Sequence, residues 1–211
     1  MSYREPLLKV DLADLRPTQI TVGYAEVVIK RAQWAAMKTK ERERQLAAHC
    51  FPAVKGPQDR FYIVDHHHLG QALREEGLKR VWVMQLADLS QVEGELFWRT
   101  MEFHRWTHPF DHKGKRRGYD AIPASIDDLR DDPYRSLAGC VRGAGGYAKD
   151  TQPYAEFLWA DFFRSRIEVS ELQPSREGHL VPEVVHEAVA MATGQAARYL
   201  PGWSGPLHPQ R

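Results

Sequence analysis

The chain has 211 residues, of which 43% are hydrophobic and 27% charged, a composition typical of a soluble globular protein that argues against global disorder. The 29 basic and 28 acidic residues leave a net charge of +1, which counts mildly against a nucleic-acid binder, although a local basic patch can exist within a neutral total. Cys50 and Cys140 do not have the spacing of a metal or redox motif, so we expect reduced thiols. The first residues lack the apolar core of a signal peptide, and no apolar run reaches the length of a membrane span. We therefore expect a cytoplasmic protein with no membrane partner.

The first 92 residues alternate between short strand patterns and helical patterns. Strands are expected at residues 7–10, 20–24, 50–54, 60–64 and 81–86. One long helix is expected over residues 25–48, because no proline interrupts it. Pro52 predicts either that the strand around it lies at a sheet edge or that the proline stands at the start of the strand. A second helix should follow Val64 and end at Gly77.

From Glu93 the pattern becomes mainly helical, with helices expected at residues 91–106, 123–130, 134–141, 154–169 and 182–200. The fold class is therefore α+β: a small mixed sheet with helices, followed by a mainly helical C-terminal part. We expect an α+β domain at 1–92, a helical subdomain packed on it at 93–175, and a C-terminal helix and tail at 176–211. The oligomeric state is left open by the sequence.

The most informative stretch is the transition from a strand into a helix at Asp65-His66-His67-His68. Asp65 stands where an N-cap belongs, and the imidazoles lie in or just before the first helical turn. Backbone N–H groups and the helix dipole favour a phosphate or carboxylate there. Consecutive helical residues point in different directions, so the three histidines cannot share one packing role. This stretch is the predicted ligand site.

A second polar cluster contains His104, His108, Asp111 and His112. A spacing of four would align imidazoles on one helical face, as metal ligands require, but Pro109 interrupts the helix. The cluster is therefore either a polar helix end or a contribution to the first site. Candidate ligands for a divalent metal (Mg, Mn or Zn) are His66, His67, His68, His104 and His108.

Two further features can be interpreted in two ways each. The basic loop contains Lys113, Lys115, Arg116 and Arg117, which suit phosphate contacts or simply carry solvated charge. Glu26 follows a predicted strand-to-helix joint, where it could serve as a general base or cap the helix.

The order of these parts carries a resemblance to a known family. Val10 to Gln19, Phe51 to Val54 and Tyr62 to Leu73 resemble the ParB/sulfiredoxin superfamily. With Asp132 to Leu137 and Glu156 to Asp161 added, the chain is similar to the uncharacterised family called "putative ParB-like nuclease".

The resemblance implies a nucleotide-phosphate site at the strand–turn–helix, which in the superfamily commonly reads Asp-Gly-His-His-Arg. Members include CTP-hydrolysing partition proteins, sulfiredoxins and serine kinases that use ADP or ATP. Asp65 matches the acid and His67 the histidine, whereas His66 stands at the glycine and His68 at the arginine. The first departure hinders backbone approach to a phosphate, and the second removes a permanently charged donor.

The leading hypothesis is an enzyme of phosphoryl or phosphodiester chemistry that uses ATP, ADP, CTP or nucleic acid, with metal assistance as an option. Its catalytic candidates are Asp65, His67 and Glu26, and its substrate-binding candidates are His66, His68 and the basic loop 113–117. A second hypothesis is a metal-dependent enzyme that acts on a small molecule through the histidines. A third is a nucleic-acid-binding module without enzymatic activity.

Overall fold

The structure, a computed structural model, describes residues 7–206, and these fall into two compact units that are each built from several segments of the chain. Unit 1 holds the described residues up to Thr21 together with Lys30–Asp111 and Lys115–Arg130. Unit 2 holds Val22–Ile29, His112–Gly114 and the described residues from Asp131 onward. The chain thus passes between the units several times, whereas the sequence suggested single boundaries near residues 93 and 176.

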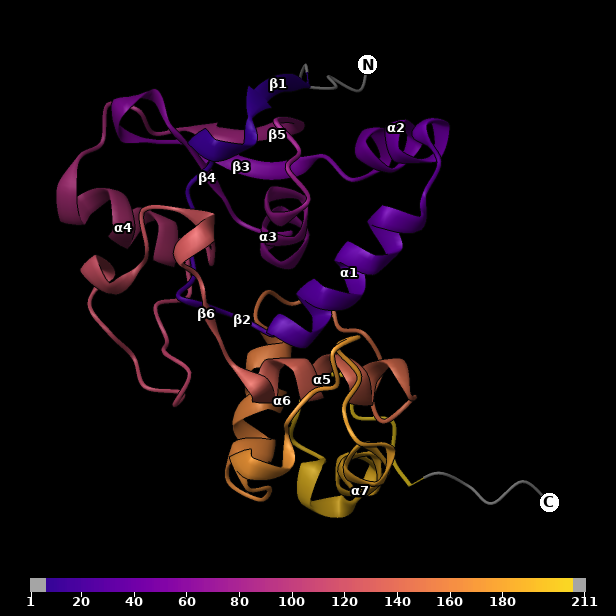
Figure 1. The fold of residues 1–211 in the computed structure, drawn as a ribbon. Helices are drawn as coiled ribbons and strands as arrows, with labels where there is room; N and C mark the ends of the chain where they lie inside the picture. The colour runs from indigo at the N-terminus through magenta and orange to yellow at the C-terminus, as the bar shows by residue number, and fades with distance from the viewer. Residues whose placement is uncertain (1–6, 207–211) are drawn as a thin grey trace, which may run out of the picture. The chain divides into compact units, whose positions relative to one another are not determined.

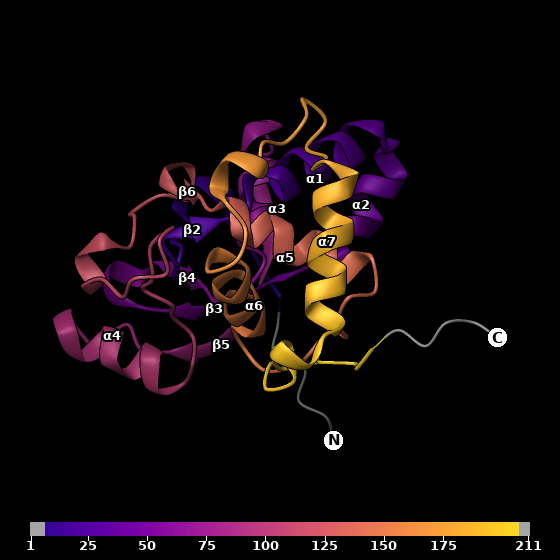
Figure 2. The same cartoon turned by 90° about the horizontal axis from the view of Figure 1, so that it is seen from below.

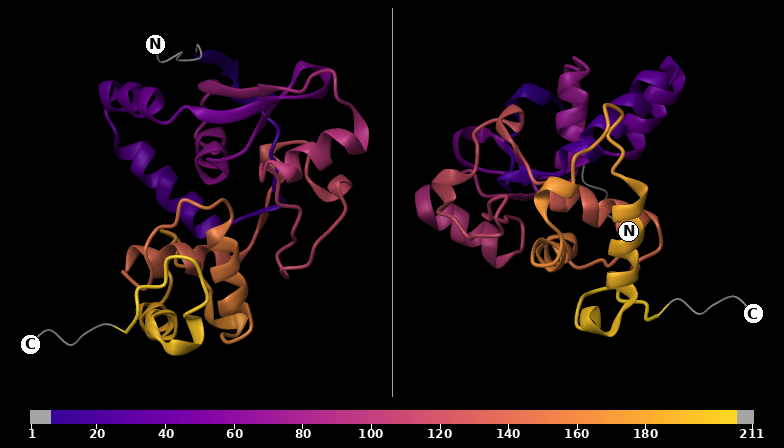
Figure 3. Two further views of the ribbon diagram at one scale, coloured as in Figure 1. Left: turned by 180° about the vertical axis from the view of Figure 1, so that it is seen from behind. Right: turned by 60° about the horizontal axis from the view of Figure 1, so that its bottom comes forward.

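Unit 1 is built on a four-stranded sheet with the order β1-β5-β3-β4 (Figure 1). β1 pairs antiparallel with β5, β5 pairs parallel with β3, and β3 pairs antiparallel with β4. The left view of Figure 3 shows these strands from behind. This sheet confirms the predicted α+β fold with a small mixed sheet. The strands are β1 Leu8–Asp11, β3 Phe51–Lys55, β4 Phe61–Ile63 and β5 Arg80–Asp88, and a separate two-stranded sheet contains β2 Thr21–Val22 and β6 Arg130–Asp131.

Strand β3 lies inside the sheet, so the edge-strand alternative is wrong, whereas Pro52 does stand at the start of the strand, as its second residue. Pro52 accepts a hydrogen bond from the N–H of Val64 at 2.9 Å, but it has no N–H with which to return a second one. The β3–β4 ladder therefore ends at the neighbouring Ala53–Ile63 pair. Because the pairing ends there, the chain is released from the sheet just before Asp65.

Helices α3 (His67–Glu75) and α4 (Gly94–Phe103) cover the two faces of this sheet. Phe51 and Val54 are three residues apart on β3 and therefore point to opposite faces. A Cβ added at Gly70 of α3 would lie 3.3 Å from the ring of Phe51, so the glycine permits close packing of α3 on β3. On the other face Val54 packs with Phe97 and Met101 of α4.

The long helix expected over residues 25–48 is in fact two helices, α1 (Tyr24–Ala36) and α2 (Thr39–Ala48). Lys38 is extended between them, and its N–H donates to the Glu41 carboxylate at 2.7 Å. This carboxylate supplies the start signal of a new helix, so the chain breaks without a proline.

Unit 2 is a cluster of helices, and α5 (Pro133–Gly143) packs against both α6 (Ala155–Arg164) and α7 (Pro182–Thr193), as Figure 2 shows from below. Its core includes the fully buried side chains of Trp159 and Phe163. Asp132, which is 1% exposed, caps α5 and accepts two hydrogen bonds from Arg164 at 3.1 and 2.9 Å. The mainly helical C-terminal part is therefore confirmed. Single 3-10 turns occupy Leu12–Asp14, Pro57–Asp59, Tyr119–Ala121, Ile126–Asp128, Val169–Glu171 and Gln195–Ala197.

Across residues 7–206, none of the helices has the length and apolar character that a membrane crossing requires.

Candidate functional site

The predicted ligand site is the turn between β4 and α3, which we call the β4–α3 turn (Asp65 to His68). The N-cap of α3 is His66, one residue later than predicted, and its backbone is left-handed with φ 66° and ψ 23°. The Asp65 carboxylate accepts the N–H of His66 at 2.6 Å and so supports this turn. A residue other than glycine rarely adopts this conformation, and such strain is typical of functional sites.

His67 is buried, with 4% of its surface exposed, and its ring connects the turn to another segment. Its Nε2 accepts the backbone N–H of Thr18 at 3.1 Å. Since an acceptor nitrogen carries no proton, the neutral ring is protonated on Nδ1. The Thr18 hydroxyl in turn donates to the carbonyl of Ile63 at 2.7 Å, at the end of β4. These contacts make His67 a residue that positions the turn.

The same Thr18 connects the turn to the second polar cluster. Its carbonyl accepts the Thr107 hydroxyl at 2.8 Å and the backbone N–H of His108 at 2.9 Å. Backbone atoms of the second cluster therefore lie beside the segment that His67 binds. The imidazole of His108, by contrast, stacks on the ring of Phe110, with the ring centroids 4.3 Å apart.

The five histidines named as metal ligands do not form one group. His104 stacks on Trp106 at 4.4 Å, and His66 packs its ring edge-on to Phe51 at 5.8 Å. His68 is half-buried in the first turn of α3. Within residues 7–206, no three histidine, cysteine or carboxylate side chains are close enough to hold a metal ion. The metal hypothesis therefore has no ligand set in the part of the chain that the structure describes.

The basic loop carries less uncompensated charge than its sequence suggested. It is the turn of a small hairpin in which Phe110 bridges Arg116. Arg117 pairs with Asp111 at 2.5 Å, and Arg116 pairs with Glu102 at 2.9 Å. Two of the four side chains that were expected to contact phosphate are thus already paired with carboxylates. Lys115 belongs with these arginines to unit 1, whereas Lys113 belongs to unit 2.

Glu26, the candidate base, belongs to unit 2 and lies in the first turn of α1. Its charge acts on Arg135, which is 6% exposed and stacks its guanidinium 3.6 Å from the ring centroid of Phe157. Burial outweighs the nearby carboxylates and lowers the pKa of Arg135 to about 10. Burial and the charge of Glu26 also raise the pKa of the Cys140 thiol. Glu26 is thus part of an electrostatic cluster within unit 2, and its role as a base stays a prediction.

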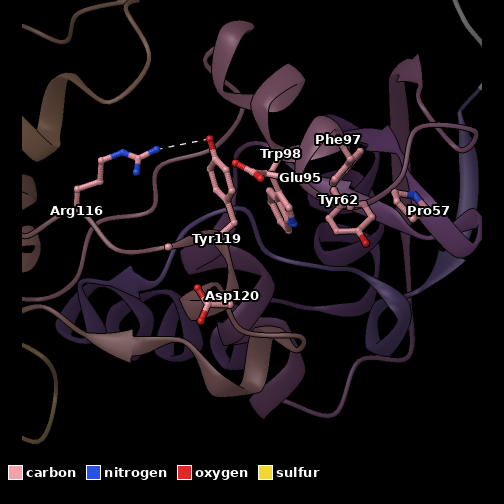
Figure 4. Close-up of a pocket in the computed structure, with 10 residues that line it drawn as sticks. Pro57, Tyr62, Glu95, Phe97, Trp98, Arg116, Tyr119 and Asp120 are labelled. Atoms are coloured by element: carbon pink, nitrogen blue, oxygen red, sulfur yellow. Dashed lines mark hydrogen bonds between the residues drawn. The ribbon is translucent and has the colours of Figure 1, made fainter.

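A feature that the sequence analysis missed is a groove in unit 1 with a volume of about 560 Å³, which we call the aromatic groove (Figure 4). Tyr62 of β4, Phe97 and Trp98 of α4, and Tyr119 come together there from three segments. Aromatic residues on neighbouring segments were the signal, but the sequence does not show that these segments meet. The lining residues are Pro57, Tyr62, Gly94, Glu95, Phe97, Trp98, Arg116, Gly118, Tyr119 and Asp120.

Comparisons with known proteins support the resemblance seen in the sequence. The model of a family described as "Putative ParB-like nuclease" matches residues 8–165. The crystal structure of protein Atu1540 from Agrobacterium tumefaciens is similar, with a TM-score of 0.87 and 42% sequence identity over 97% of this chain and 100% of that chain. A comparison with curated proteins finds no match.

Proposed function

This chain belongs to the family described as putative ParB-like nucleases, and we propose from that premise that it holds a phosphate group of a nucleotide or nucleic acid at the start of α3 and promotes phosphoryl or phosphodiester transfer there. The observation that carries the proposal is the geometry of the β4–α3 turn. A left-handed His66 directs the chain from a sheet strand into a nine-residue helix, with three imidazoles at its positive end.

The electrostatics of the helix start favour an anion for two reasons. The first N–H groups of a helix point along its axis toward any ligand at that end, and the aligned peptide dipoles add a partial positive charge. A phosphate oxygen is the ligand that suits this end.

The side chains of the turn divide into positioning and reacting groups. Asp65 and His67 hold the backbone through the bonds to His66 and Thr18, so they position the site. His66 and His68 supply imidazoles that can take up or release a proton near neutral pH. In the proposed step one imidazole removes the proton of the attacking oxygen, the new O–P bond forms, the bond to the leaving oxygen breaks, and that oxygen receives a proton.

Metal assistance finds no support in the arrangement of the described residues, since they provide no group of three ligating side chains. We therefore assign no step to a metal. Nucleotide cofactors (ATP, ADP or CTP) stay within the proposal as phosphate donors, and nucleic acid stays within it as a substrate.

The first experiment compares thermal stability with ATP, ADP, CTP or single-stranded DNA for the wild-type protein and a double variant, His66→Ala with His68→Ala. His67 is kept because its buried ring binds Thr18. His104→Ala is the matched control, because His104 is an exposed histidine outside the turn. A ligand at ~100 times its dissociation constant stabilises the folded state by about 2.7 kcal/mol.

We expect at least one ligand to stabilise the wild type and the control but not the double variant. Release of phosphate or of cleaved strands by the wild type then separates an enzyme from a binding module. Stabilisation that survives in the double variant would contradict the assignment of the phosphate site to this turn.

A further inference from the structure

We propose that the aromatic groove binds an unpaired nucleobase by stacking, so that the substrate of the β4–α3 turn is a single-stranded nucleic acid. The inference rests on the phosphate site proposed above and adds to it a separate base site. The volume of about 560 Å³ lies within the ~300–1,000 Å³ typical of ligand pockets.

Trp98 is the centre of the groove. Tyr62 and Phe97 contact it edge-on, with ring centroids 5.6 and 5.2 Å away and interplanar angles of 88° and 69°. Tyr119 lies nearly parallel to it, at 5.9 Å and 14°. A base between these two parallel rings would need about 7 Å, the sum of two stacking contacts. The base therefore stacks on an outer face of this pair, whose orientation the other two rings fix.

Gly56 is what allows the rings to approach one another. A Cβ at this position would lie 2.6 Å from the ring of Tyr62 and 2.7 Å from the ring of Phe97. Any larger residue would push these rings toward the groove. The glycine thus keeps the platform in place before a ligand arrives, which reduces the ordering cost of binding.

The charges around the groove fit a base with flanking phosphates. Arg16 forms a β-bridge with Tyr62, and Arg60 lies two residues before Tyr62 in the chain. Burial raises the pKa of the Tyr62 hydroxyl, and the charges of these two arginines oppose that rise. Their hydrogen bonds go to the carbonyl of Ala124 and the amide of Gln58, which carry no charge that would neutralise them. Both guanidinium groups can therefore attract phosphate beside the base.

One carboxylate in the lining suits the edge of a base. Asp120 can accept a hydrogen bond from the amino group of a base, whereas the Glu95 carboxylate already pairs with Arg99 at 2.7 Å. In Figure 4, Tyr119 lies between Arg116 and Trp98, and the Arg116 guanidinium is 5.5 Å from the Tyr119 ring. The same guanidinium pairs with Glu102 at 2.9 Å, so Arg116 supports the position of the Tyr119 ring and adds little net charge to the groove.

The groove and the β4–α3 turn are within reach of one strand. Tyr62 precedes Asp65 by three residues, so their backbones are separated by at most about 10 Å, and a strand that reaches both sites passes the end of β4 from the α4 face of the sheet to the α3 face. A base in a duplex is paired and stacked on its neighbours, and it would have to leave the helix before it could enter the groove. Single-stranded substrate avoids that cost.

The test measures the affinity of a fluorescent single-stranded oligonucleotide, a strand of the same length without bases, and a duplex. The variants are Trp98→Ala, Trp98→Phe, Tyr119→Ala and the control Phe103→Ala, whose side chain lies on the same helix and is 82% exposed. Loss of one stacked base weakens binding roughly tenfold to a hundredfold. We expect this loss for Trp98→Ala and Tyr119→Ala with the base-bearing strand, and no loss for Trp98→Phe or Phe103→Ala.

The abasic strand shows whether a variant is still folded and separates the two proposals. The Trp98→Ala variant should bind the abasic strand as the wild type does, because the phosphates of the strand still reach α3. If Trp98→Ala unfolds, Tyr119→Ala takes its place in the test. If the wild type binds abasic and base-bearing strands equally, or if both alanine variants bind the normal strand unchanged, the base site is wrong while the phosphate site stands. If the wild type binds no strand but is stabilised by ATP, ADP or CTP, this inference fails while the phosphate site stands, and if it binds neither strand nor nucleotide, both proposals fail.

Discussion

The β4–α3 turn begins three residues after Tyr62, the residue that β4 contributes to the aromatic groove. The two sites are nevertheless held by different kinds of interaction. The turn depends on single directed hydrogen bonds, such as the one from Thr18 to His67. The groove depends on ring packing around Trp98, which involves no directed bond between the rings. The β4–α3 turn is therefore sensitive to the loss of any single hydrogen bond. The aromatic groove is instead sensitive to the volume of the side chains packed around it.

The largest effect that this comparison predicts is for His67→Ala. The change leaves the buried N–H of Thr18 without its acceptor and opens a cavity, so we expect a loss of about 2 to 4 kcal/mol in the free energy of unfolding. Urea denaturation at neutral pH measures it. His67→Gln, which can place an acceptor near the same position, should recover part of the loss. Equal losses in the two variants would mean that packing, and not the hydrogen bond, holds the turn.

The groove should respond most strongly to added volume, so we expect Gly56→Ala to cost about 1 to 3 kcal/mol through overpacking against Tyr62 and Phe97. The backbone of Gly56, with φ −120°, suits alanine, so strain in the backbone contributes little. Gly143→Ala is the control, because a Cβ there meets nothing within 4 Å. Urea denaturation of both variants decides the point, and equal stabilities would contradict the close approach of the rings.

The smallest predicted effect is a pH dependence at the rim of the groove. Hydrogen bonds from Tyr119 and Arg116 lower the pKa of Glu102 below its ordinary 4.5. Because the folded pKa is the lower one, Glu102 stabilises the fold above pH 4.5, and this contribution is lost as the pH falls through the folded pKa. The pair is half-exposed, so the expected size is only about 0.2 to 1 kcal/mol.

Denaturation of Glu102→Gln from pH 7 to pH 3 tests this sign. The wild type should be the more stable protein at neutral pH and should lose that advantage in acid. An advantage that grows on acidification would show that the carboxylate is not stabilised by its partners.

Several features that depend on neighbouring residues agree with the prediction, although the break between α1 and α2 at Lys38, which is also local, was missed. The strand before Asp65, the helix that follows, and its stop at Gly77 with φ 75° all agree with the structure. The helix expected over residues 154–169 is present as the shorter α6. Turn chemistry and hydrophobic periodicity are local properties, so they can be read from a single sequence.

Features that depend on distant partners were missed. No local pattern shows that β5 pairs with β3 and so places Pro52 inside the sheet. The sequence also could not show that the arginines of the basic loop would find Glu102 and Asp111. For the same reason the groove stayed hidden, because Tyr119 comes to Trp98 only through the fold. The family resemblance supplied the fold and the turn, but no residue of the groove except Tyr62.

The interleaving of the two units has a consequence for synthesis on the ribosome. Residues 22–29 belong to unit 2, and Val27 in this segment is fully buried, yet apart from His112–Gly114 the rest of the unit begins only at Asp131. At ~5–20 residues per second, these early residues wait roughly 5 to 20 s for their partners to be made. The nascent chain must therefore expose an apolar segment that a simple two-domain order would have buried sooner. Chaperone dependence of expression should follow this delay, and a fragment that ends at residue 130 should be more prone to aggregation than the full chain.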